Sequence, residues 1–173
     1  EVLARRPGSL RAVLVGDGSL RHELADRIAE AGAGDAVRLV GSVPHEEVAA
    51  WLGRADIYVS LNHLGNLSNA NLEAIAAGKC MIILDADHQT HTDMETTRLI
   101  PDDAVLRIGR DSMEANLAMA LESLLDVPEK ITSYAAATAR LGKELLRPWD
   151  VRITHELDMI RHIAREKTLF HDG

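Results

Sequence analysis

Residues 57–84 constrain the fold of this chain more than any other stretch, because they predict a strand, a polar loop, a helix and a second strand in direct succession. Ile57–Leu61 is β-branched and aromatic, which is typical of a buried strand, and Cys80–Leu84 is a second short apolar run. The segment between them is rich in Asn, with Ser68 able to cap a helix, Glu73 one turn into that helix and Gly78 at its end. Two apolar strands joined through a helix indicate a parallel sheet.

The chain continues this alternation on both sides of residues 57–84 and then becomes helical. Further strands are expected at 10–15, 37–40 and 104–108, with a helix at about 20–31 and a short helix around 48–52. From Asp111, which can form a capping box with Glu114, apolar residues recur at helical spacing. We therefore expect an α/β fold, a Rossmann-like parallel sheet with right-handed crossovers, flanking helices and extra C-terminal helices. At least four parallel strands should form, and the residues expected to be buried in them are Val13, Val40, Val59 and Ile82.

The loop that precedes Glu73 is the best candidate for a binding site. A polar loop that leads into a helix N-terminus, at the end of a buried parallel strand, is where α/β proteins bind phosphate. Glu73 lies near the same opening and can accept hydrogen bonds from a pair of sugar or ribose hydroxyls. Two simpler interpretations stay open: Glu73 as an exposed carboxylate near the helix dipole, and the Asn residues as turn formers.

Composition narrows the class of protein. A chain of 173 residues fits about one domain, and a formal net charge of -8 argues against a broad nucleic-acid surface, so we expect no nucleic-acid partner. Cys80 is the only cysteine, which excludes an intrachain disulfide and indicates a core residue in a reducing compartment. No signal peptide is visible, and no apolar run approaches the ~20 residues that span a bilayer. A cytoplasmic protein is expected, with peripheral contact at the inner membrane face as the second option.

Four motifs, in order, resemble a known family. They are GDGSLR at 16–21, LVGSVPHEE at 39–47, RADIYVSL at 54–61 and NLEAIAAGKCMII at 71–83. Together they are similar to the C-terminal, donor-binding half of a retaining glycosyltransferase of family 4, the group 1 family with the GT-B fold. The resemblance covers roughly residues 10–160, and its specificity comes from the ordered set rather than from any single motif. It implies transfer of a sugar from a nucleotide diphosphate sugar to an acceptor, without a cofactor or a metal ion.

The resemblance also implies roles for individual residues. In the family, two Glu residues with seven residues between them frame the donor site; the second, at Glu73 here, binds the ribose hydroxyls, and the first faces the transferred sugar. Gly65 occupies that first position, so either Asn62, His63 or Asn66 replaces the carboxylate or the site is altered. Backbone N–H groups around Ser68 to Ala70 would face the diphosphate. The implied donor site comprises Gly16, Gly18, Gly41, Val43, Gly65, Asn66, Ser68, Asn69 and Glu73, with no catalytic residue assigned.

The chain departs from the family beyond Gly65. The family's Arg and Lys, which neutralise the diphosphate, belong to a first strand and loop upstream of the region covered here, and the acceptor-binding N-terminal domain is also missing. A start at Glu1 without Met, and Ala86–Gln89 where the family has a Gly-Gly turn, are further differences. We therefore interpret residues 1–173 as a single Rossmann-like domain, helical at about 111–165, from a larger two-domain enzyme. The isolated fragment should be inactive, and the acceptor could be a glycan, a lipid or a small molecule.

Several other patterns have plainer explanations. Asp85, Asp87, His88 and His91 are metal-ligand types, yet they follow one another in a loop without helical spacing, so solvated loop chemistry is expected. Two rival functions stay open: half of a GT-B nucleotide-sugar epimerase, and a degenerate domain that binds only a nucleotide or a partner protein. Gly65 favours the degenerate domain. Trp51 and Trp149 are expected in the core, and His155 and His162 at the surface of an amphipathic helix.

Overall fold

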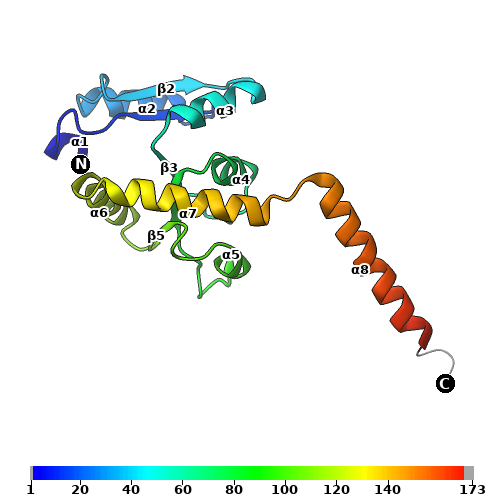
Figure 1. Ribbon diagram of the computed structural model, residues 1–173. Helices are drawn as coiled ribbons and strands as arrows, with labels where there is room; N and C mark the ends of the chain where they lie inside the picture. The colour runs from blue at the N-terminus through cyan, green and yellow to red at the C-terminus, as the bar shows by residue number, and fades with distance from the viewer. Residues whose placement is uncertain (1, 170–173) are drawn as a thin grey trace.

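The computed structural model describes residues 2–169 of the chain, in which strands and helices alternate before three final helices (Figure 1). The strands are β1 (Ala12–Val15), β2 (Val37–Gly41), β3 (Ile57–Ser60), β4 (Cys80–Leu84) and β5 (Leu106–Ile108). The helices are α1 (Val2–Arg5), α2 (Arg21–Glu30), α3 (His45–Arg54), α4 (Asn69–Ala76), α5 (Met94–Leu99), α6 (Met113–Asp126), α7 (Glu129–Leu145) and α8 (Trp149–Leu169).

The strands are parallel throughout, as expected, but they divide between two sheets instead of forming one. β1 pairs with β2, and β3, β4 and β5 form a second sheet in that order. Figure 1 shows the β1–β2 sheet with α2 and α3 above the body that contains β3, β4, β5 and the later helices. The prediction of at least four parallel strands is confirmed, and the division into two sheets was not foreseen.

The core is built on both faces of β4, whose five residues are all buried. Side chains alternate between the two faces of a strand, so β4 contributes to two clusters. Met81 and Ile83 pack with Ile75 of α4 and with residues of α7, whereas Ile82 packs with Leu124 of α6 on the other face. Helices therefore cover both faces of the second sheet, and they fix the position of α4.

The burial expected for the strand residues holds for β4 and fails for β1 and β3. Ile82 is fully buried and Val40 is partly buried, but Val13 is 48% exposed and Val59 is 39% exposed, so the prediction for these two was wrong. Both residues lie on edge strands, because among residues 2–169 β1 pairs only with β2 and β3 only with β4. Side chains project from the faces of a sheet, and neither valine packs into a core cluster, whereas helices cover both faces of β4.

The caps predicted from the sequence are confirmed at one helix and wrong at another. Ser68 caps α4 as predicted, its hydroxyl accepting a hydrogen bond from Asn71 N at 3.3 Å. The capping box at Asp111 and Glu114 is wrong, because Ser112 adopts a left-handed conformation and α6 begins only at Met113. The carbonyl of Asp111 instead accepts a hydrogen bond from the side chain of Asn116, at 2.7 Å. Helix α5 was not predicted at all.

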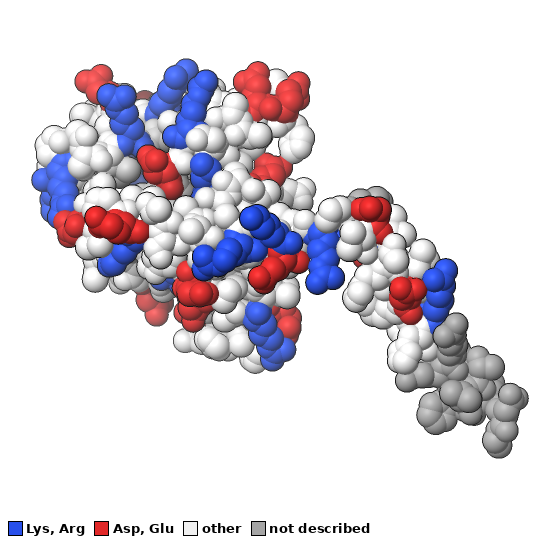
Figure 2. Space-filling model, in the orientation of Figure 1, with Lys and Arg blue, Asp and Glu red and all other residues white. Residues whose placement is uncertain are grey.

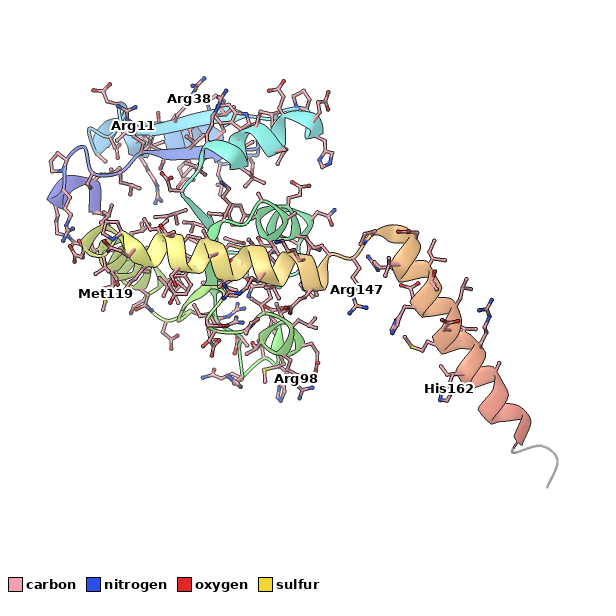
Figure 3. All side chains as sticks on the ribbon, viewed as in Figure 1. Arg11, Arg38, Arg98, Met119, Arg147 and His162 are labelled. Carbon is pink, nitrogen blue, oxygen red and sulfur yellow. The ribbon has the colours of Figure 1, made fainter. Side chains whose placement is uncertain are left out.

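Helix α8 extends away from the rest of the molecule (Figure 1). His155 and His162 are exposed on it, as expected, and Figure 3 shows His162 far from both sheets. Trp51 is only partly buried, and the side chain of Trp149 lies outside the described residues. Across residues 2–169, none of the helices combines the length and the apolar character needed to cross a membrane. Apolar side chains nevertheless remain exposed along α8: Val151, Ile153, Leu157, Met159, Ile160 and Ile163.

Candidate donor-binding site

Three loops meet at the carboxyl ends of β3, β4 and β5. Arg110, just after β5, joins them, because its guanidinium donates hydrogen bonds to the backbone oxygens of Asp85 at 2.9 Å and His63 at 3.2 Å. The carboxyl edge of a parallel sheet is where α/β proteins place their ligands, and here it is also where the Asn-rich loop enters α4. Residues 61–68, which the sequence analysis predicts to face a sugar donor, are called the donor loop from here on.

Helix α4 begins directly after the donor loop, with Ser68 partly buried and Asn69 exposed. The first N–H groups of an α-helix have no partner inside the helix and carry the positive end of its dipole. Ser68 satisfies one of them, at Asn71. The others make this helix start a suitable place for a phosphate group.

Glu73 lies on the second turn of α4, and 32% of its side chain is exposed. One carboxylate oxygen, Oε1, is 3.6 Å from Nδ1 of His45, the first residue of α3. His45 comes two residues after Val43, so this contact brings the loop that follows β2 next to α4. The loop that follows β2 and the second turn of α4 are therefore neighbours.

The glycine after β1, Gly16, lies against the last residue of β2, Gly41. Gly16 N donates a hydrogen bond to Gly41 O at 2.9 Å, and both residues have positive φ angles, +128° and +84°. A Cβ at Gly41 would lie 3.0 Å from Nη1 of Arg21, so a side chain there would collide with this guanidinium. Gly18, in the turn before α2, donates its N–H to Asp17. Arg21, the first residue of α2, is a cation near the predicted nucleotide side that the sequence analysis did not single out.

Asn66 differs most from the sequence-based expectation. Its side chain is fully buried, and its Nδ2 donates to Leu84 O at 2.9 Å and to Asp93 Oδ2 at 2.6 Å. The amide therefore holds the donor loop in place and does not line an open surface. Asn66 Oδ1 is buried without a hydrogen-bond partner among the described residues.

Asn71 and Tyr58 extend this polar network under α4. Asn71 is fully buried; its Nδ2 donates to Asn66 O at 3.0 Å, and its Oδ1 accepts a hydrogen bond from the Tyr58 hydroxyl at 2.9 Å. Burial is the main reason why the pKa of Tyr58 is raised; a hydrogen bond with Ser60 acts in the opposite direction, and the negative charge of Glu73 adds to the rise. An Asn on the inner face of a helix is the only signal by which the sequence could have shown this network.

Gly65 lies beside a carboxylate that belongs to a different loop. Its φ is +148°, a conformation that favours glycine, and a Cβ there would lie 3.4 Å from Oδ1 of Asp93. The Gly that interrupts the expected Glu pair is thus next to an acidic group 28 positions further along the chain. Asp93 was missed because nothing in the local pattern connects it to the donor loop.

The loop after β4 shows turn chemistry at its acidic residues. Asp87 accepts hydrogen bonds from the backbone N–H groups of Gln89 and Thr90, at 2.9 and 3.1 Å, and the hydrogen bonds with Thr90 are the main cause of its lowered pKa. His88 and His91 are exposed. Within residues 2–169, no group of three or more His, Cys, Asp or Glu side chains is arranged to hold a metal ion.

The charged residues do not form a field of one sign. Figure 2 shows basic and acidic side chains interspersed over the face in view. Arg38 on β2 stacks over the ring of Trp51 at 5.6 Å, as does Arg54, so both cations are engaged with α3. In Figure 3, Arg11 and Arg38 project from the β1–β2 sheet on the side away from the second sheet.

Comparison with known proteins identifies the family. The sequence pattern of the group 1 glycosyl transferases matches residues 1–126, which is most of the chain. The chain belongs to the group 1 glycosyl transferases. No curated protein matches the sequence. Membership accounts for the parallel α/β architecture and supports a role in sugar transfer.

Solved structures of this family share the fold at low sequence identity. Sucrose-phosphate synthase from Thermosynechococcus elongatus is 20% identical with a TM-score of 0.72, over 95% of this chain and 41% of that one. HepE from Anabaena, in complex with UDP, is 15% identical with a TM-score of 0.72, over 95% of this chain and 43% of that protein. The C-terminal domain of a group 1 glycosyl transferase, LpcC from Francisella tularensis, is 20% identical with a TM-score of 0.69, over 84% and 74%. The chain therefore spans less than half of the first two proteins.

The structure brings some of the predicted site residues together and leaves their ligand untested. Ser68, Asn69 and Glu73 lie on one helix start, and His45 connects Glu73 to the loop of Gly41 and Val43. Gly16 and Gly18 lie at the carboxyl end of β1. Their assignment to a sugar donor stays a prediction.

Proposed function

We propose that this chain is the donor-binding domain of an enzyme that moves a sugar from a nucleotide diphosphate sugar to an acceptor. One observation carries the proposal: Glu73 lies on α4, whose capped N-terminus opens at the carboxyl edge of the second sheet, and it contacts the loop that follows β2 through His45. In this arrangement Glu73 binds the ribose hydroxyls, the loop of Gly41 and Val43 lies beside the base, and the start of α4 receives the diphosphate.

The chemistry requires that the leaving diphosphate be stabilised as its negative charge grows. Helix N–H groups do this because their dipoles already point at the phosphate, and cationic side chains add to the effect. Arg21 is the cation of this chain that lies against Gly41, on the same edge as the predicted nucleotide side. No metal ion is needed for this mechanism, and the stereochemistry, by resemblance, is retention at the transferred sugar.

Two related structures support the choice of ligand. The Anabaena protein HepE has been solved with UDP and with UDP-glucose, and over 83% of this chain the second of these matches with a TM-score of 0.66 at 18% identity. We propose the same class of ligand here, and we leave the base and the sugar open. Transfer itself would take place in the complete protein, where a second, acceptor-binding domain completes the cleft.

A thermal-shift screen with UDP, GDP and ADP, each with and without its sugar, tests the ligand class. A ligand that binds the folded chain raises its unfolding temperature by mass action, so the shifts rank the bases. No shift with any nucleotide at millimolar concentration would contradict the proposal.

Substitution of Glu73 tests the ribose role. In Glu73→Gln the carboxylate is replaced by an amide of the same shape, and a hydrogen bond to a charged group is worth ~1.5–3 kcal/mol, so nucleotide affinity should fall roughly tenfold or more. Glu129→Gln, which changes an exposed carboxylate in the first turn of α7, is the matched control and should leave the affinity unchanged. Titrations followed by NMR measure both affinities. Equal affinity of Glu73→Gln and the unaltered chain would remove Glu73 from the site.

Gly65 supports a second candidate, a degenerate domain that binds a nucleotide without sugar transfer. The position that faces the transferred sugar in the family carries no side chain here. Sugar transfer by the complete protein, measured as nucleotide release that depends on an acceptor, separates this candidate from the enzyme. Nucleotide binding without any turnover would favour the degenerate domain.

A further inference from the structure

Asp93 reaches the donor loop from the loop after β4. Its Oδ2 accepts two hydrogen bonds from Asn66, from the backbone N at 3.0 Å and from Nδ2 at 2.6 Å, and its Oδ1 accepts a hydrogen bond from the hydroxyl of Thr96. Asp93 adopts a left-handed conformation with φ of 66°, directly before α5. One carboxylate thus accepts three hydrogen bonds, two of which come from the donor loop.

Asn66 also forms hydrogen bonds with α4 and with the end of β4, so it links Asp93 to both elements. Its Nδ2 also binds Leu84 O at the end of β4, and its carbonyl accepts a hydrogen bond from Asn71 Nδ2 at 3.0 Å. Asn71 in turn binds Ser68 through its N–H and Tyr58 through its Oδ1. The contacts form one continuous chain from Asp93 through Asn66 to the residue that caps α4.

A carboxylate suits this contact. An ionised carboxylate only accepts hydrogen bonds and has room for about four, so it can accept from the N–H, the amide and the hydroxyl together. An Asn at this position could keep all three contacts only by turning its NH₂ toward the Thr96 hydroxyl, and both hydrogen bonds from Asn66 would then end on a neutral oxygen. Hydrogen bonds to a charged acceptor are also stronger than neutral ones.

Gly65 belongs to the same arrangement. A Cβ at this position would lie 3.4 Å from Asp93 Oδ1, and the φ of +148° disfavours any side chain. A side chain at 65 would therefore start in contact with the Asp93 carboxylate and on a strained backbone. Gly65 and Asp93 are therefore matched to each other in this chain.

We propose that Asp93 is the positioning residue of the donor site, fixing the donor loop through Asn66 so that the start of α4 meets the diphosphate. This inference rests on the proposed function and assigns the acidic group that holds the site in shape. Asp93 acts through Asn66 and the donor loop, not by contact with the nucleotide.

The test compares Asp93→Asn with Asp87→Asn in the full 173-residue chain. Both carboxylates belong to the loop after β4 and each accepts two N–H hydrogen bonds, but those of Asp87 stay within its own turn. UDP, GDP and ADP are titrated against each variant by NMR, and hydrogen exchange is measured over residues 61–72. Asp93→Asn should weaken nucleotide affinity about tenfold and increase exchange in the donor loop, whereas Asp87→Asn should change the affinity less than twofold.

Asn66→Ala and the double variant with Asp93→Asn complete the design. If both residues act through one chain of contacts, the affinity of the double variant should be no lower than that of the single variant that binds the nucleotide less tightly. Additive losses, an unchanged affinity in Asp93→Asn or an equal loss in Asp87→Asn would overturn the proposal. If the unaltered chain binds no nucleotide, the donor site and the proposed function fall together. Hydrogen exchange then still shows whether Asp93 holds the loop.

Discussion

Gly78 offers a measure of how tightly α4, which begins the candidate site, is fixed against α7. It ends α4 with a φ of +59°, and a Cβ there would lie 3.0 Å from Cβ of Ala139. Gly32 ends α2 with nearly the same φ, +61°, but a Cβ there would meet nothing within 4 Å. Ala substitutions at the two glycines therefore separate two contributions to the free energy of unfolding: the cost of a left-handed backbone, which both share, and the cost of a crowded contact, which only Gly78 has.

The expected magnitudes follow from these two differences. Ala in the left-handed region costs about 1–2 kcal/mol, offset in part by the ~0.4–1 kcal/mol that Gly→Ala contributes by restricting the unfolded chain. Gly32→Ala should thus destabilise the chain by about 1 kcal/mol or less. Gly78→Ala adds overpacking against Ala139, typically ~1–3 kcal/mol, so its total should be about 2–4 kcal/mol.

Urea unfolding, with the free energy extrapolated linearly to water, measures both variants under the same conditions. Gly34→Ala, at an open glycine whose φ lies outside the left-handed region, serves as a control for the substitution itself. Equal losses in Gly78→Ala and Gly32→Ala would refute the contact between α4 and α7 as a constraint on the site. A larger loss in Gly32→Ala would refute the strain argument as well.

Two further predictions concern the donor and the core. The isolated chain should bind UDP or GDP with a dissociation constant near the millimolar end, roughly -4 kcal/mol, and about as well as the sugar conjugate because Gly65 carries no side chain; a micromolar affinity in an NMR titration, or a strong gain from the sugar, would contradict this. Burial raises the pKa of Cys80 to about 11, above that of an unfolded thiol, so its stabilising contribution is complete below the unfolded pKa and lost as pH rises toward the folded one. Urea unfolding between about pH 8 and pH 11 should therefore show a decline that Cys80→Ala reduces, and identical pH profiles would contradict the assignment.

Sequence patterns predicted the parts of the fold that depend on local chemistry. The apolar run of β4, the Ser68 cap and the end of α4 at Gly78 are set by neighbouring residues, and all three are found in the structure. The exposure of Val13 and Val59 was not predictable in this way, because an apolar strand gives no sign of whether another element packs on its face. Burial of a strand's side chains depends on which elements pack against the whole sheet, and the strand's own sequence does not encode this.

The candidate site shows the same division. The start of α4 and the place of Glu73 on it were predicted from local residue types, and their position at the carboxyl edge follows from the parallel topology, while their role stays a prediction. The burial of Asn66 and its contact with Asp93, 27 residues further along the chain, depend on how two loops meet, which local patterns do not encode. Arg110 was missed for the same reason.

The free edges of β1 and β3 have a practical consequence for work on this chain by itself. Among residues 2–169 these edges have no neighbouring strand, so each presents a row of backbone N–H and C=O groups, and Val13, Leu14 and Val15 expose apolar surface on β1. Such edges recruit strands from other molecules, so concentrated samples of the chain alone should associate and tend to precipitate. An oligomer in such a sample would therefore be expected to form by pairing of strands at these edges.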